Sequence, residues 1–276
     1  MERLLDGKVI IITGAGAGIG RGTAVFFAQE GARVVLVGRT PKTLEETREE
    51  VAAIGGTALV VRADVSVSAD CKRMVEETVQ AFGRLDCAVN NAAIDPMPVL
   101  LADYDEDHFD QIIAINLKGI WNCMKYEIPA MIAAGGGSIV NTSSSAAQPA
   151  MERMGPYVAA KYGLDGLTKT AAYEYGPQNV RVNILGVGPI DTAMLFDYFP
   201  KVFNLDPSGC ANTNEVVKKY PAETEPFMKR VPMRRFGLVR ECAEAAAWLC
   251  SDRASYTTGT NLFVCGGHSV RGAGTM

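Results

Sequence analysis

The stretch KVIIITGAGAGIG, Lys8 to Gly20, decides the fold of this chain. A short β-branched run passes directly into a turn with glycines at positions 14, 18 and 20, and a helical period follows over about 18–30. Glycine allows such a tight turn and lets the backbone approach a phosphate group. The first amides of the following helix then face that anion. The order strand, glycine turn, helix therefore predicts a dinucleotide-binding unit.

The same alternation continues to the end of the chain. Short runs typical of buried strands follow one another: RVVLV, ALVVR, CAVN, SIVN, VRVNIL and NLFVC. Helical segments over about 42–54, 69–82, 106–133, 157–175 and 241–249 separate them. Repeated β-α units form a parallel sheet with helices on both faces. We expect one α/β domain, 1–276, of the Rossmann type: a doubly wound parallel sheet of about seven strands.

The segment 190–231 breaks this rhythm. It mixes six aromatic residues with four prolines, and we expect it to be a long segment without regular structure. Such segments in compact domains are usually functional or mobile. It could be a packing insertion or part of a subunit contact. We favour a lid over an apolar substrate, because the predicted cofactor site lies beside it.

Composition excludes several classes of function. The formal charge of −4, from 27 basic and 31 acidic residues, gives no reason to expect nucleic acid as a partner. Glu2 and Asp6 stand where a signal peptide would be basic and apolar, and no apolar run is long enough to span a membrane, so we expect a cytoplasmic protein. Seven scattered cysteines without a C-x-x-C and only two histidines make a metal site unexpected.

Tyr157 precedes Lys161 by four positions, so the two side chains should share one face of a helix. The pair could be a half-buried aromatic beside a solvated lysine, which is common on amphipathic helices. It could also be chemical, because a nearby cation stabilises phenolate and lowers a phenol pKa from its usual value of about 10.

The other motifs decide between these interpretations. The glycine turn follows the pattern T-G-x-x-x-G-x-G, NNAA covers 90–93, and RADV, INLKG, NTSS, YVAAK and GPIDT follow in order. With these motifs the sequence resembles the short-chain dehydrogenase/reductase family over nearly its whole length. Two positions depart from the family pattern: Ala93 replaces a glycine, and Val187 stands where proline is common.

The resemblance implies a catalytic tetrad of Asn116, Ser144, Tyr157 and Lys161. Tyr157 would be the general acid/base, with its pKa lowered by Lys161. Ser144, 13 positions before Tyr157, would bond the substrate oxygen, with Ser143 and Ser145 as competing candidates. Asn116 would hold a water that relays protons to Lys161.

The resemblance also implies the cofactor contacts: Gly14, Gly18, Ile19, Gly20, Arg39, Asp64, Val65, Asn90, Asn91, Ala92, Tyr157, Lys161, Ile190 and Thr192. Gly38 occupies the place where members that prefer NAD carry an acid, and Arg39 follows it. An arginine there suits the 2′-phosphate of NADP(H). The basic residue often found in the glycine turn is replaced by Ala17, so NAD(H) stays possible.

The predicted reaction interconverts a secondary alcohol and a ketone by hydride transfer. A bulky apolar substrate such as a hydroxysteroid is the first hypothesis. Alternatives are a sugar, a polyol or a 3-oxoacyl substrate, for which Arg230, Arg234 and Arg235 could dock an acidic carrier protein. A catalytically silent, dinucleotide-binding regulatory protein is a further alternative. The resemblance also implies a homo-oligomer, a tetramer or a dimer.

Overall fold

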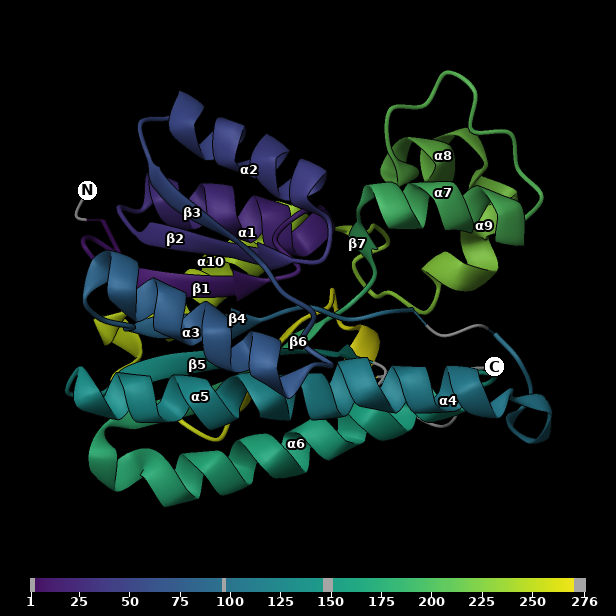
Figure 1. Ribbon diagram of the computed structural model, residues 1–276. Helices are drawn as coiled ribbons and strands as arrows, with labels where there is room; N and C mark the ends of the chain where they lie inside the picture. Colours follow the sequence, from purple (N-terminus) through teal and green to yellow (C-terminus); the bar gives the residue numbers. More distant parts are fainter. Residues whose placement is uncertain (1–2, 96–97, 146–150, 271–276) are drawn as a thin grey trace.

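A seven-stranded parallel sheet runs through the centre of the molecule (Figure 1). The computed structural model describes residues 3–95, 98–145 and 151–270. Its strands are parallel, as the alternation of the sequence predicts, and their order is β3-β2-β1-β4-β5-β6-β9. The strands are β1 (Val9–Thr13), β2 (Arg33–Gly38), β3 (Thr57–Arg62), β4 (Cys87–Asn90), β5 (Gly137–Ser144), β6 (Val180–Val187) and β9 (Asn261–Val264). The order reverses between β1 and β4, and ligands of such sheets bind beyond the carboxyl ends of strands at this reversal.

Two helical layers cover the sheet because its strands are apolar on both faces. Along β1, Ile10 and Ile12 belong to the apolar cluster on one face of the sheet, whereas Ile11 belongs to the cluster on the other face. The helices on the first face are α1 (Gly18–Gln29), α2 (Pro41–Ala53) and α10 (Val239–Cys250). Those on the second are α3 (Ser68–Phe82), α4 (Glu106–Ile113), α5 (Ile120–Ala133) and α6 (Gly155–Tyr175).

The segment 190–231 is more regular than the sequence suggests. It holds the short strand β7 (Ile190–Asp191), paired with β8 (Gly237–Leu238), and the helices α7 (Ala193–Val202), α8 (Thr213–Lys219) and α9 (Pro221–Met228). The expectation of an irregular segment was wrong because its prolines fit helix ends. Pro221 opens α9, where no amide hydrogen is needed, and Pro200 and Pro226 lie near the ends of their helices.

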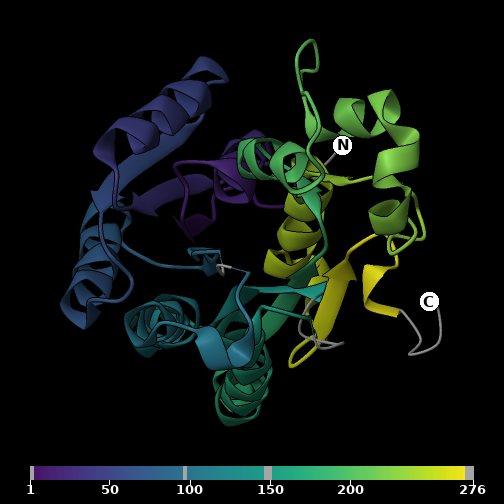
Figure 2. The same cartoon turned by 90° about the vertical axis from the view of Figure 1, so that its right-hand side faces the viewer.

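Three of the six aromatic residues of this segment form an apolar cluster together with Phe236. Phe199 lies 4.7 Å from Phe203, 5.4 Å from Phe227 and 5.1 Å from Phe236 between ring centroids. The chain after α9 packs against the residues that follow β9, where Met233 N donates to Gly266 O at 3.1 Å (Figure 2). This contact holds the segment beside the carboxyl edge of the sheet. Among the residues that the structure describes, none of the helices could cross a membrane.

Candidate active site

The glycine turn between β1 and α1 has no room for side chains at two positions. Gly14 has a φ of +69°, and a Cβ there would lie 2.9 Å from Asn91 Nδ2. A Cβ on Gly20 would lie 2.2 Å from the carbonyl oxygen of Gly14. Both positions therefore require glycine, and the turn packs directly on the residues after β4.

The start of α1 fits the diphosphate of a dinucleotide. Ala17 at the N-cap has no side-chain oxygen for the first amides, and the first turn, 18–21, contains no acid. Its amides and the positive end of the helix dipole can therefore receive an anion. A Cβ on Gly18 would point toward Thr192, 3.6 Å from its methyl group, so Gly18 and Thr192 face each other. Ile19 packs instead with the apolar residues beneath.

Thr13, the first residue of the motif, fixes the chain after β4. Its Oγ1 accepts hydrogen bonds from Asn91 N at 2.9 Å and Ala92 N at 3.0 Å. Asn91 Nδ2 donates in return to Thr13 O at 3.1 Å. Thr13 is thus a further residue of the site beyond those predicted, and its place at the start of the glycine motif is the signal that marks it.

Asn90 differs from Asn91 and Ala92 because its side-chain amide donates hydrogen bonds inside the core. Asn90 Nδ2 donates to Glu127 Oε2 at 2.9 Å and to Asn141 Oδ1 at 3.1 Å, and all three side chains are fully buried. Asn141 Nδ2 donates onward to Thr168 Oγ1 on α6 at 3.0 Å. The network joins β4 and β5 to α5 and to the helix that carries Tyr157. A contact of Asn90 with a dinucleotide would have to come from its backbone.

Asn116 lies where the predicted long helix 106–133 is interrupted. Residues Ala114–Gly119 form a π-helical turn between α4 and α5. The Asn116 amide accepts from Ile94 N and donates to Ile94 O, both at 2.8 Å, and is fully buried. π-turns inside α-helices are rare and occur often at functional sites. Asn116 therefore ties the turn to the loop that follows the NNAA motif.

The three serines at the end of β5 have different surroundings. Ser143 Oγ is buried, with no hydrogen-bond partner among the described residues, and Ser145 Oγ pairs with His268 Nδ1 at 2.8 Å. Ser144 hydrogen-bonds Tyr157. The geometry therefore distinguishes Ser144 from its two competitors.

Tyr157 and Lys161 lie side by side in the first turns of α6, as their spacing predicts. Lys161 Nζ lies 5.5 Å from the centroid of the Tyr157 ring. It donates to Thr142 O at 3.0 Å, and the lysine side chain is buried. The Thr142 carbonyl on β5 thus orients the Lys161 ammonium on α6.

The electrostatics of this pair differ from the expectation. Burial raises the pKa of Tyr157 to about 12, the Ser144 hydrogen bond opposes this rise, and the Asp95 carboxylate adds to it. Burial also lowers the pKa of Lys161 to about 8, which Asp95 partly offsets. The predicted lowering of the Tyr157 pKa by Lys161 was therefore wrong, because loss of water penalises both charged forms.

Asp95 is a further acidic residue at the site that the sequence analysis did not single out. It lies on the loop after NNAA and acts electrostatically on both Tyr157 and Lys161. Partial loss of water around its carboxyl raises the Asp95 pKa, and the charge of Lys161 offsets part of this rise. No pattern in the sequence marks this residue.

The other end of the predicted cofactor site lies at the ends of β2 and β3. Arg39 and Asp64 line one cavity of about 290 Å³ there. Asp64 Oδ1 accepts from Ser66 N at 2.9 Å and from Ser66 Oγ at 2.7 Å. Val65 is buried, and its carbonyl accepts from Asn122 Nδ2 at 2.9 Å.

Ile190 and Thr192 lie where the chain leaves the sheet for the α7–α9 segment. Ile190 is buried in β7, and Thr192 Oγ1 caps α7 by accepting from Leu195 N at 3.3 Å. The unusual Val187 simply ends β6, and Gly188 N donates to Val264 O at 2.9 Å. The structure thus brings the glycine turn, the NNAA loop, the tetrad and this connection to one edge of the sheet.

Comparison with known proteins agrees with this geometry. Residues 8–201 match the short chain dehydrogenase family, and residues 208–269 match a second family, described as enoyl-(acyl carrier protein) reductase. A short chain dehydrogenase/reductase of Aspergillus oryzae is 41% identical over 268 residues, which are 96% of each chain. A 2,5-dichloro-2,5-cyclohexadiene-1,4-diol dehydrogenase of Sphingobium indicum is 40% identical and covers 96% of this chain and 98% of its own. The crystal structure of levodione reductase superposes with a TM-score of 0.87 at 32% identity, covering 97% of this chain and 100% of that one.

The chain belongs to the short-chain dehydrogenase/reductase family. It is an oxidoreductase that acts on CH–OH groups or the corresponding ketones with a nicotinamide dinucleotide, NAD(P)(H), as cofactor.

Proposed function

We propose that this enzyme interconverts a cyclic, largely apolar secondary alcohol and its ketone, with NADP(H) as the preferred cofactor. The observation that carries the chemistry is the joint placement of Ser144, Tyr157 and Lys161. Ser144 and Tyr157 are hydrogen-bonded, and Lys161 lies beside the phenol. The glycine turn lies at the same edge of the sheet, so a dinucleotide and a carbonyl group could meet there.

Each residue of the tetrad has a distinct task in this proposal. The Ser144 and Tyr157 hydroxyls bond the substrate oxygen, and Tyr157 gives it a proton in reduction or takes one in oxidation. Lys161, oriented by Thr142 O, supplies positive charge and would hold the ribose of the cofactor. The bound nicotinamide supplies or accepts the hydride. Since both atoms of the Asn116 amide are engaged by Ile94, a water for proton relay would be held by the backbone of the π-turn.

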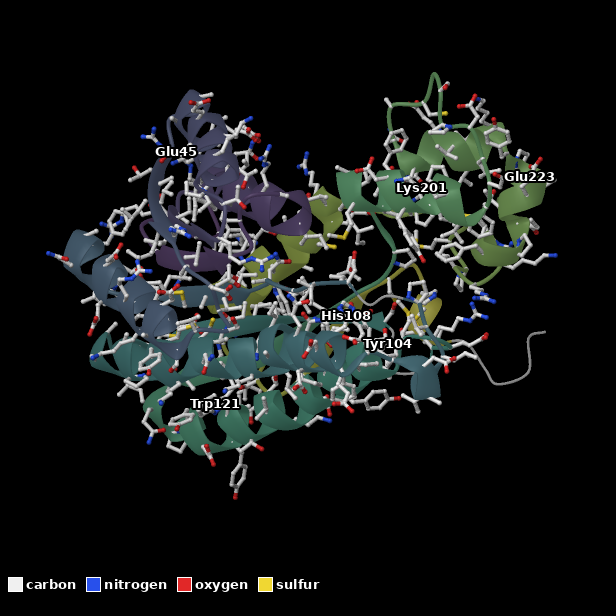
Figure 3. The ribbon with its side chains drawn as sticks, turned by 45° about the vertical axis from the view of Figure 1, so that its right-hand side comes forward. Glu45, Tyr104, His108, Trp121, Lys201 and Glu223 are labelled. Carbon is white, nitrogen blue, oxygen red and sulfur yellow. The ribbon has the colours of Figure 1, made fainter. Side chains whose placement is uncertain are left out.

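Two features support an apolar ring as substrate. The relative from Sphingobium indicum is named for a diol on a six-membered ring. The α7–α9 segment exposes Met194, Tyr198 and Val202 at intervals of four residues, which places them on one face of α7. We propose that this segment is the substrate lid. Tyr104 and His108, whose rings stack with centroids 6.1 Å apart, lie at the end of α4 nearest that segment (Figure 3). A hydroxysteroid would be among the largest of the cyclic apolar alcohols that this proposal covers.

A 3-oxoacyl substrate on a carrier protein is the second candidate. Residues 208–269 match a family whose description, enoyl-(acyl carrier protein) reductase, names a carrier-bound substrate. The arginines that could dock an acidic carrier are partly neutralised. Arg235 forms an ion pair with Glu241, and Arg234 one with Glu225. This pairing favours a free small molecule over a carrier-bound one.

The preference for NADP(H) is supported by Arg39, which lines the cavity at the end of β2 where an acid would otherwise repel a 2′-phosphate. Arg39→Asp should shift the ratio of kcat/KM for NADPH over NADH toward NADH by at least tenfold. An unchanged ratio would make Arg39 a bystander.

The substrate proposal is tested with a panel of ketones: substituted cyclohexanones, a ketosteroid, a sugar ketone and a 3-oxoacyl thioester. We expect the highest kcat/KM with the ring ketones and turnover lower by about 10²-fold or more with Tyr157→Phe. A preference for the thioester would replace the proposal by its second candidate. Cofactor binding without oxidation of NADPH by any ketone would favour a silent regulatory protein. Assembly into a homo-oligomer and location in the cytoplasm remain proposals from the sequence, testable by light scattering and by cell fractionation.

A further inference from the structure

A second arginine, Arg62, lines the same cavity as Arg39. The cavity of about 290 Å³ is bounded by Arg39, Arg62, Ala63, Asp64, Asp70 and Arg73. Gly38, at the end of β2, pairs in register with Arg62, at the end of β3, and Ala63 N donates to Gly38 O at 2.9 Å. Arg39 directly follows Gly38, so the two arginines lie at the carboxyl ends of neighbouring strands, and both line this one cavity.

The other charged groups of the cavity are already engaged. Arg73 donates to Asp70 Oδ1 at 3.0 Å and to the Arg62 carbonyl at 2.8 Å. Asp70 Oδ2 accepts from Asp64 N at 2.9 Å. Within residues 3–95, 98–145 and 151–270, neither the Arg39 nor the Arg62 guanidinium forms an ion pair or a hydrogen bond. Arg62 acts only through space, on Asp70, whose pKa is lowered chiefly by its hydrogen bonds to Asp64 and Arg73. Two guanidinium groups thus keep all their donors for a ligand.

The start of α2 adds to the positive potential at this place. Thr40 is the N-cap, Pro41 opens the helix, and the first three residues contain no acid. The first amides of a helix lack partners within the helix and favour anions. This helix end immediately follows Arg39, so it faces the same region.

We propose that Arg62 and Arg39 together bind the 2′-phosphate of NADP(H). The phosphate carries close to two negative charges and three acceptor oxygens, which two planar guanidinium groups can bond at once. The inference rests on the proposed preference for NADP(H) and extends it to a residue on a different strand. It also makes a basic residue in the glycine turn, absent here at Ala17, unnecessary for holding the phosphate.

The test measures binding, so that it does not depend on turnover. Adenosine 2′,5′-bisphosphate and adenosine 5′-monophosphate serve as probes in titration calorimetry with the intact protein. The variants are Arg62→Ala and Arg39→Ala, with Arg48→Ala as the matched control, because Arg48 is exposed on α2 and pairs with Glu45. Thermal melting of each variant checks that it is folded.

We expect Arg62→Ala to weaken binding of the bisphosphate by at least tenfold and of the monophosphate by less than twofold. Arg48→Ala should leave both unchanged, and the dependence of bisphosphate affinity on salt should become shallower in Arg62→Ala, since one cation fewer meets the phosphate. Equal losses for both probes, or no loss, would overturn the inference. If only Arg39→Ala abolishes the discrimination, Arg62 is excluded while the cofactor proposal stands. If the unmodified protein binds both probes equally, the cofactor proposal fails and this inference fails with it.

Discussion

Glu127 should carry a proton in the folded enzyme at neutral pH, and this gives a sharp test of the buried network. The side chain is fully buried on α5, and its Oε2 accepts a hydrogen bond from Asn90 Nδ2 at 2.9 Å. Burial raises the pKa of Glu127 from 4.5 to about 8, against the lowering effect of Asn90. The folded protein therefore binds a proton that the unfolded chain releases above about pH 4.5.

The sign and size of the effect follow from this pKa difference. Because the folded-state pKa is the higher one, the contribution of Glu127 to stability is fully present below pH 4.5 and is lost as the pH rises through about 8. Each unit of pKa difference corresponds to about 1.36 kcal/mol, so the whole loss is roughly 5 kcal/mol. Glu127→Gln keeps the shape and an acceptor for Asn90 but cannot ionise. Its stability relative to the unmodified enzyme should therefore rise by about 1.4 kcal/mol per pH unit between pH 5 and 8.

Urea denaturation at pH 5, 6, 7 and 8, at one fixed protein concentration, measures this difference. Glu174→Gln is the control, because Glu174 is exposed on α6 and its variant should show no such slope. A stability difference between Glu127→Gln and the unmodified enzyme that stays constant with pH would refute a buried neutral carboxyl. It would mean that Glu127 is ionised in the core.

Three further predictions concern the catalytic and cofactor sites. Tyr157→Phe should lower kcat by about 10²-fold or more, the usual contribution of a general acid, while the Kd for the dinucleotide in a fluorescence titration stays within twofold; an active variant would refute the assignment. Gly20→Ala places a Cβ 2.2 Å from a backbone carbonyl and should abolish dinucleotide binding, whereas Gly166→Ala, in open space among the described residues, should leave it unchanged. Since the pKa of Lys161 is about 8 and that of Tyr157 about 12, kcat/KM for ketone reduction should fall as the pH rises through about 8. Asp95→Asn should move this fall to lower pH, and a profile that stays flat to pH 10 would contradict the role of the Lys161 charge.

The strands and the order of the motifs could be predicted because they are local in the sequence. β1, β2, β5 and β6 are apolar β-branched runs between helical periods, and the glycine turn has its own spacing. Lys161 and Tyr157 share a helix, so their proximity follows from spacing alone. The segment 190–231 was harder, since its helices are short and contain prolines, and an aromatic cluster stabilises them by contacts that the local sequence does not show.

The electrostatics depended on tertiary burial and could not be derived from the order of residues. A lysine four positions from a tyrosine lowers the phenol pKa where water solvates both the phenolate and the ammonium. The fold removes that water and reverses the direction. Glu127, between Tyr126 and Ile128, has the sequence environment of an ordinary helical glutamate, and only its packing against Asn90 reveals otherwise. Arg62 stands next to the recognised Asp64 motif, yet its proximity to Arg39 comes from the pairing of β2 with β3.

The separate apolar cluster of α7–α9 has a consequence for how this enzyme can diversify. Phe199, Met228, Val231 and Phe236 are buried against one another, apart from the two clusters that flank the sheet. Mutations on the outer face of these helices therefore leave the packing of the main scaffold intact. If this segment is the proposed substrate lid, natural variation or laboratory selection can change substrate recognition there without altering the residues that carry out hydride transfer.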